Sequence, residues 1–414
     1  MNRESERVPG TTTPSSSAKP IRAPHGTTLS CKAWPQEAVL RLLMNSLDPD
    51  VHDSPPRDLQ NFNEIVASLQ SLEGNQTLLV RANDLEVVHT SAESPRAIAA
   101  SSGETNWISI GPQASLPALA EMISAAAGAP SNGNLAGKLI VSASMSRACA
   151  AVSLAATMHG AAFLGIDASS EIIKRRVKNG YCDVMVNDLD EALRILKNGV
   201  RKREPASVGL VGARRKIVAE LADRGLVPDI LVDEIRPNNR DQNISAALVT
   251  LQSYGTLVIA PEEAIHSADS ARRTILCIAP SGEPSDIQRV DRLLLEIFPA
   301  NEGLARLIKT AQRRIRHQGL PARACALNLT ESRMFAAALN ASISRNEFKA
   351  PVVLTSARPC DAASLSLDLD SLIAIANGAV LAIFRSSGGL TVTRALVLDG
   401  SLDAAAHIAR VFET

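Results

Sequence analysis

The sequence predicts an α/β fold in which a doubly wound, Rossmann-like parallel sheet domain lies between N- and C-terminal α/β parts. Aromatic residues make up only 3% of the chain, and the abundant Ala, Leu, Ile and Val suit helices packed on buried strands. Short apolar runs alternate with helical patterns along the middle of the chain, which is typical of a parallel sheet covered on both faces. With 414 residues and 45% hydrophobic content, the chain is long enough for two or three domains.

The first two segments are an arm and an N-terminal domain. Residues 1–27 are rich in Ser, Thr, Pro and charge, and we expect this arm to be disordered. In residues 28–137, "PQEAVLRLLMNSLDPDV" predicts a helix with Pro35 near its first turn and Asp48-Pro49 at its end. "NFNEIVASLQSLE" predicts a second helix, "TLLVRA" a strand, and "NWISIGPQASLPALAEMISAAAG" a strand followed by a helix. "APSNGNLAG" then reads as a linker because of its Gly, Asn, Pro and Ser residues.

Residues 138–262 form the predicted Rossmann-like domain, and residues 263–414 a C-terminal domain of mixed α/β character. The predicted strands of the central domain are "KLIVSAS", "AAFLGID", "YCDVMVND", "ASVGLVG", "PDILVDE" and "GTLVIAPE". Helical stretches such as "EIIKRRVKNG", "LDEALRILKNG" and "RRKIVAELADRGL" separate them.

Charge and cysteine content exclude several classes of function. Lys plus Arg equals Asp plus Glu at 43 each, so no net field attracts nucleic acid or an anionic membrane, and we expect a small-molecule or protein partner. No apolar run is long enough to span a bilayer, and the N-terminus lacks the apolar centre of a signal peptide, which predicts a cytoplasmic protein. The six cysteines form no C-x-x-C pair, so we predict buried, reduced thiols and no metal site.

The loop after "KLIV" resembles the first turn of a dinucleotide-binding unit but contains no glycine. Ser144 and Ser146 are candidate hydrogen-bond donors to a phosphate, and Arg147 is a candidate ion-pair partner for it. The alternative, which we favour, is that Ser146 caps the following helix and Arg147 points to solvent. Asp167 ends the second strand, where an acid commonly binds ribose hydroxyls. The histidines suggest no catalytic arrangement.

Long collinear segments resemble the urocanase (urocanate hydratase) family, of which this chain looks like a shortened and divergent member. They include "LSCKAWPQEAVLRLLMNSLDPDV", "NWISIGPQASL", "LADRGLVPDILVDE" and "SGEPSDIQRVDRLLLEIFPANEGLARLIKTAQRRIRHQGLPAR". The resemblance implies a hydro-lyase (a carbon-oxygen lyase) of histidine catabolism that converts urocanate to imidazolonepropionate. In this family a tightly held NAD acts as an electrophile rather than as a hydride acceptor, and the protein is a homodimer.

Most of the positions that bind ligand in the family are changed in this chain. Gln113 and Asp167 match positions that contact the cofactor. The glycine loop is replaced by residues 144–150, and the substituted blocks are Ala213, residues 234–238, residues 260–263 and residues 385–389. No catalytic residue is assigned, because the resemblance places the family's active-site cysteine in a loop that is largely missing here. Cys277 fits inside the neighbouring strand instead.

Three hypotheses follow from these changes. The first, which we favour, is a protein that has lost NAD-dependent hydration and acts in ligand binding, in regulation or as a partner subunit, either as a homodimer or with a related urocanase. The second is a lyase of changed specificity, whose rebuilt pocket would draw on Arg147, Arg236, Glu262, Glu263, Glu283 and Arg385. The third is a genuine but weak urocanate hydratase that still holds NAD.

Overall fold

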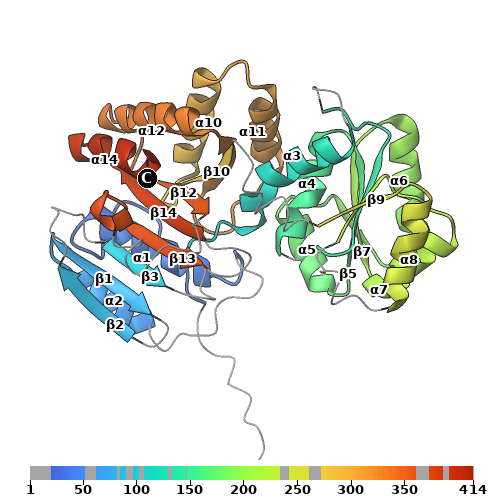
Figure 1. Cartoon of the computed structure of the whole chain (residues 1–414), viewed down its shortest axis with the longest axis horizontal. Coiled ribbons are helices and arrows are strands. Elements are labelled where there is room, and N and C mark those ends of the chain that lie inside the picture. Colours follow the sequence, from blue (N-terminus) through green and yellow to red (C-terminus); the bar gives the residue numbers. More distant parts are fainter. Residues whose placement is uncertain are drawn as a thin grey trace, which may run out of the picture.

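The computed structural model describes residues 20–413 except 52–61, 82–83, 90–96, 102–106, 129–132, 146, 234–241, 261–271, 360–372 and 386–390. Figure 1 shows two lobes, each built on its own sheet. Most of the predicted arm lies outside the described residues. Residues 20–27, at the end of that arm, contact the larger lobe: Arg41 Nη1 donates to Gly26 O (2.7 Å), and Gly26 N donates to Ser281 O (2.7 Å).

Both ends of the chain contribute strands to the sheet of the larger lobe. Its strands are β1 (Gln76–Arg81), β2 (Asp84–His89), β3 (Ala97–Ser101), β10 (Arg273–Ile278), β11 (Ala322–Leu327), β12 (Val352–Pro359), β13 (Leu381–Arg385) and β14 (Thr391–Leu398). They lie in the order β11-β10-β12-β14-β13-β3-β1-β2. Because β13 pairs in parallel with β3, the N- and C-terminal parts of the chain share one mixed sheet.

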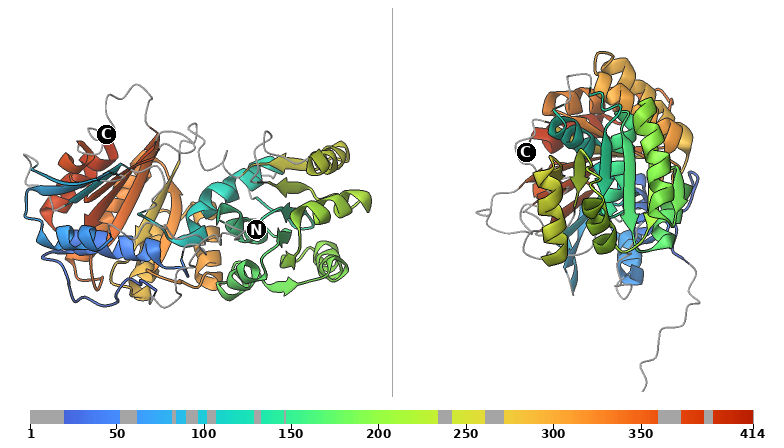
Figure 2. Two further views of the ribbon diagram at one scale, coloured as in Figure 1. Left: turned by 90° about the horizontal axis from the view of Figure 1, so that it is seen from below. Right: turned by 90° about the vertical axis from the view of Figure 1, so that its right-hand side faces the viewer.

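Helices cover both faces of this sheet, as the left view of Figure 2 shows. Successive strand residues point to opposite faces, so Leu78 packs with α1 (Trp34–Leu47) and α2 (Phe62–Ser71), whereas Leu79 lies in the other core. In the larger lobe, the helices of that second core are α10 (Pro284–Ile297), α11 (Glu302–Arg314), α12 (Leu329–Ser344) and α14 (Leu402–Glu413). The predicted first helix is confirmed, with Pro35 in its first turn and Asp48 at its C-cap.

The prediction of a strand at "NWISIG" is wrong. Residues 107–110 contain no strand, and the chain turns at Gly111, which has φ +72°, into the 3-10 turn η1 (Gly111–Ser115) and helix α3 (Leu116–Ala126). A positive φ breaks an extended strand, and Pro112 cannot donate a hydrogen bond to a neighbouring strand. Gln113 therefore lies on a tight turn that leads into the smaller lobe.

The smaller lobe confirms the predicted Rossmann-like sheet. Its strands are β4 (Leu139–Ser142), β5 (Ala162–Asp167), β6 (Val184–Val186), β7 (Ala206–Val211), β8 (Ile230–Val232) and β9 (Leu257–Ile259). All of them pair in parallel, in the order β6-β7-β5-β4-β8-β9. Its helices are α4 (Val152–Met158), α5 (Ser170–Lys178), α6 (Leu189–Lys202), α7 (Arg214–Asp223) and α8 (Gln242–Ser253).

The strand order of the smaller lobe brings two loops together. From β4 the chain adds strands on one side and then, at β8, on the other, so the segments after β4 and β8 meet at the carboxyl edge of the sheet. Ligands of open α/β sheets bind in this position. The candidate site is therefore the carboxyl edge around β4, β5, β7 and β8.

Candidate functional site

The loop after β4 is held by groups of the chain itself. The N–H of Met145 donates to Asp167 Oδ2 (3.2 Å), and Arg176 Nε donates to Met145 O (2.9 Å). Arg176 is 2% exposed, so this bond lies inside the lobe. The carbonyl of Ser144, the residue before Met145, accepts a hydrogen bond from Ser142 Oγ (2.7 Å). Backbone groups that would face a ligand in a phosphate-binding loop are thus bonded within the protein.

The side chain of Met145 fills the space above the neighbouring strands. It is fully buried and lies against Gly165 of β5 and Gly209 of β7. A Cβ placed on Gly165 would overlap the thioether of Met145, and one on Gly209 would lie 3.4 Å from its sulfur. Gly165 therefore makes room for the Met145 side chain at the edge where a dinucleotide would lie, whereas a Cβ on Gly209 would overlap Ile173 and would be in ordinary contact with Met145.

Asp167 ends β5, as predicted, but both of its carboxylate oxygens bind backbone N–H groups. Oδ2 accepts from Met145, and Oδ1 accepts from Ser169 N (2.9 Å) at the start of α5. Ser169 in turn caps α5 through its hydroxyl, which accepts from Ile172 N (3.4 Å). In this arrangement Asp167 fixes the loop after β4 relative to α5, and its oxygens are directed at the chain rather than at a ribose.

Gln113 lies close to this loop. The turn η1 packs against η2 (Arg147–Ala151), the 3-10 turn that precedes α4. Gln113 is 4% exposed, and its Nε2 donates to Ile110 O (3.2 Å). Its Oε1 is buried and has no hydrogen-bond partner in the described part of the chain. A buried amide oxygen without a partner is costly, so this atom marks a position for a donor from a ligand or a water.

The remaining predicted phosphate contacts receive no support from side-chain geometry. Ser146 lies outside the described residues, and the side chain of Arg147 is likewise not described. The segment begins as a 3-10 turn, and α4 is only 7 residues long. The dipole of such a short helix offers little attraction to an anion.

An ion pair closes the other side of the edge. Arg214, the first residue of α7, places Nη2 2.8 Å from Asp233 Oδ1, which follows β8 and is 1% exposed. The preceding residue, Ala213, caps α7 without a side-chain hydrogen bond.

Four residues of this edge were not predicted from the sequence: Met145, Arg176, Arg214 and Asp233. The parallel between "GID" and "LVD", two strands that end on an acid, is a signal that points to Asp233.

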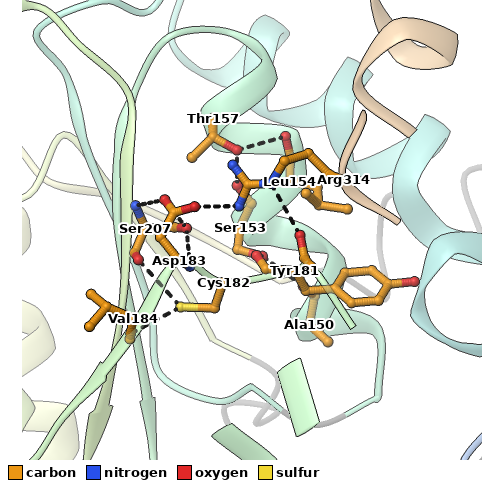
Figure 3. A network of polar contacts seen from close by, with 11 residues as sticks. Ala150, Ser153, Leu154, Thr157, Tyr181, Cys182, Asp183, Val184, Ser207 and Arg314 are labelled. Carbon is orange, nitrogen blue, oxygen red and sulfur yellow. Dashed lines mark hydrogen bonds and ion pairs between the residues drawn. The ribbon is translucent and has the colours of Figure 1, made fainter. Parts of the chain in front are cut away.

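The smaller lobe is joined to the larger one near the amino ends of β6 and β7, where Figure 3 shows Asp183 and Ser207. Arg314 at the end of α11 pairs with Asp183 (2.7 Å) and donates from Nε to Gly180 O (3.3 Å). Asp183 also accepts from the hydroxyl of Ser207 (2.7 Å), and Ser153 of α4 donates to Tyr181 O. These contacts link α4, β7 and the segment after α5 to α11.

The five described cysteines are free thiols buried in the protein. Cys277 lies inside β10, as predicted, and is fully buried. The neighbouring thiol of Cys325 on β11, together with burial, raises the pKa of Cys277 well above its usual value. A thiol that stays protonated is a weak nucleophile. The described residues contain no cluster of three or more metal-binding side chains, and their helices are too short or too polar to cross a membrane.

Of the charges proposed for a rebuilt pocket, Glu283 is described most fully, and it lies in an ion pair. Its Oε2 is 3.2 Å from Lys349 Nζ, on the larger lobe and partly exposed to solvent. Arg236, Glu262 and Glu263 lie outside the described residues, and the side chain of Arg385 is not described.

Three family models match consecutive parts of the chain. Residues 21–109 match the urocanase N-terminal domain, residues 111–239 the urocanase Rossmann-like domain, and residues 275–368 the urocanase C-terminal domain. The matches follow one another along most of the chain, and the middle one covers the parallel sheet described above. The chain therefore belongs to the urocanase family.

Proposed function

We propose that this chain is a urocanase family protein that has lost NAD-dependent hydration of urocanate and acts by binding a small ligand or a partner subunit. The observation that carries the proposal is the loop after β4, where Met145 and Asp167 bond to the chain itself. The residues present do not fit a dinucleotide at this edge, so we derive no catalytic step through NAD.

The energy needed to open the site supports this proposal. A dinucleotide in the usual position would have to displace the Met145 side chain and compete for the oxygens of Asp167. Exposing a buried methionine costs about 1.5–3 kcal/mol, and each buried hydrogen bond left without a partner about 1–3 kcal/mol. These costs add to several kcal/mol, which corresponds to a loss of affinity of roughly a thousandfold or more.

The unpaired Oε1 of Gln113 favours ligand binding over a purely structural role. It lies buried beside η2, within the part of the fold that matches the Rossmann-like domain. A ligand with an N–H or O–H donor would satisfy this oxygen. Mass spectrometry of the purified protein is the direct search for such a molecule, and the Gln113→Leu variant, which removes the acceptor, is its control.

Two measurements test the loss of the family reaction. Titration calorimetry with NAD up to millimolar concentration should give no binding heat, and urocanate mixed with NAD and the protein should keep its ultraviolet absorbance. NAD that co-purifies with the chain, or steady consumption of urocanate, would contradict the proposal. The Met145→Gly variant shows whether the side chain is the obstacle, because weak NAD binding should appear when it is removed.

A hydro-lyase of changed specificity is the alternative. It needs polar groups that converge at the edge of the sheet, and the ion pair of half-buried Arg214 with buried Asp233 is a described candidate for such a role. Under this alternative, substituting Arg214 by Met should abolish binding of whatever ligand co-purifies. Under the main proposal, the Gln113→Leu variant has the larger effect.

A further inference from the structure

A buried ion pair lies beneath the end of α11. Arg323 of β11 is 3% exposed and binds Asp291 of α10 through two hydrogen bonds, from Nε to Oδ1 (2.6 Å) and from Nη2 to Oδ2 (2.9 Å). Gln312 of α11 donates to the same Oδ2 (3.0 Å). The remaining nitrogen of the guanidinium, Nη1, is buried and has no hydrogen-bond partner among the described residues. A buried N–H group without an acceptor is costly, so Nη1 marks a position for an acceptor.

His317 supplies a second buried atom of this kind. It lies on the turn between α11 and β11, and its Nδ1 likewise has no partner in the described part of the chain. Burial and the neighbouring Arg323 guanidinium lower the pKa of His317 to about 4. The His317 ring is only half-buried and Gln312 is exposed, so the two unpaired nitrogens lie just below the protein surface. A carboxylate has two oxygens and can accept one hydrogen bond from Arg323 and one from the Nδ1–H tautomer of His317.

The exposed surface of the same segment is positively charged. Residues 303–330 contain six Lys or Arg residues and no Asp or Glu, although the whole chain has 43 charges of each sign. Lys309, Arg313 and Arg316, the α11 stripe, are exposed and form no ion pair with a described residue. Arg316 Nη1 donates to Lys178 O (3.4 Å) at the end of α5, and Lys178 is exposed as well. The end of α11 therefore attracts anions.

A row of exposed cations does not by itself single out this position. α6 also has exposed cations, Arg194 and Lys197, but two acids of its first turn, Asp190 and Glu191, lie within four residues of Arg194. None of the buried side-chain atoms without a partner in the described residues belongs to α6. At the end of α11, surface charge and unpaired buried nitrogens coincide, and the described residues run without a gap from 272 to 359.

We propose that the end of α11 binds a small molecule with two carboxylates, one held by Arg323 and His317 and the other by the α11 stripe. This site belongs to the larger lobe and goes beyond the proposed function. The buried position favours a carboxylate over a phosphate group, because Asp291 already neutralises Arg323 and a doubly charged phosphate would be buried without an opposite charge. The exposed guanidinium groups of Arg313 and Arg316 can each bind the second carboxylate through two hydrogen bonds.

Titration calorimetry of the full chain with succinate, a flexible dicarboxylate, tests the proposal at constant ionic strength. Succinate should bind the wild-type chain with a Kd below about 1 mM. His317→Leu removes Nδ1, and the double variant Arg313→Gln/Arg316→Gln removes the exposed charges. Each should weaken binding at least about tenfold, because each removes hydrogen bonds to a carboxylate. Acetate, which has a single carboxylate, should bind at least about tenfold more weakly than succinate.

Arg194→Gln/Lys197→Gln is the matched control, since it removes the same charge from exposed positions on α6. This variant should bind succinate as the wild-type chain does, and circular dichroism confirms that all variants are folded. Absence of succinate binding, an equal loss in the α6 control, or wild-type affinity in either α11 variant would overturn the proposal. Tighter binding of inorganic phosphate than of succinate would overturn the assignment of a carboxylate. No titration contains NAD, so this inference and the proposed function are tested separately.

Discussion

Met145 holds the loop after β4 in a packed conformation. Its N–H donates to Asp167, and its carbonyl accepts from Arg176. Its side chain packs against the strand glycines Gly165 and Gly209. In a phosphate-binding turn, glycine leaves that volume to the ligand. Here an apolar side chain occupies it, and burial of that side chain stabilises the closed loop.

Asp167 accepts hydrogen bonds from the loop after β4 and from the start of α5. Changing it to Ala leaves two backbone N–H groups without acceptors, so we expect a loss of about 2 kcal/mol or more in the free energy of unfolding. Asp188→Ala is the control, because Asp188 only caps α6 through Glu191 N (2.9 Å), a contact worth about 1 kcal/mol. Urea denaturation measures both. Equal losses for the two variants would show that Asp167 does not hold the loop after β4.

At the scale of elements, the end of α5 and the end of α11 form one of the contacts between the lobes. Gly180 has φ +82°, and a Cβ placed on it would overlap the carbonyl oxygen of Arg314. Arg316 N donates to Asn179 O (3.1 Å), which adds a backbone bond across the same junction. The close approach of the two backbones depends on the missing side chain at Gly180.

We therefore expect Gly180→Ala to destabilise the protein by about 3 kcal/mol or more, because both the backbone conformation and the junction must change. Gly225→Ala is the matched control: Gly225 has φ +62°, with no atom within 4 Å of the added Cβ. Its expected cost is about 1–2 kcal/mol, which reflects the positive φ alone. Thermal unfolding of the two variants separates the effects. A Gly180→Ala variant no less stable than Gly225→Ala would exclude a tight junction.

At the scale of the whole molecule, buried His159 and the half-buried His317 and His407 contribute to how stability responds to acid. Burial, together with the nearby Arg323 guanidinium, lowers the pKa of His317 from 6.5 to about 4, opposed by Asp291. Burial also lowers the pKa of His159 and of His407. These side chains are neutral in the folded protein, and the unfolded chain binds protons more readily.

The unfolded chain takes up a proton at His317 as pH falls below 6.5, whereas the folded protein does so only near pH 4. The stability due to neutral His317 is therefore complete above pH 6.5 and is lost progressively between pH 6.5 and 4. Urea midpoints measured across this range should fall, and they should fall less steeply in the His317→Gln variant. An identical pH slope in the two proteins would rule out this role for His317.

The α/β class and the central sheet are predictable from the sequence because buried parallel strands are continuous apolar runs, as in "AAFLGID" and "ASVGLVG". The shared sheet of the larger lobe is harder to predict. β3 and β13 are separated by most of the chain, and no local pattern encodes their parallel pairing. The failed strand at residues 107–110 has a local cause, the turn at Gly111.

For the candidate site, the sequence by itself determined that the loop after β4 lacks glycine and that Asp167 ends β5, since both are properties of neighbouring residues. Only the tertiary structure decided what replaces the missing glycines. Arg176 lies 31 residues from Met145 along the chain, and Gly209 lies further still, yet parallel strand pairing places them around the same loop. Contacts of this kind depend on how strands and helices are stacked, and residue spacing alone does not specify them.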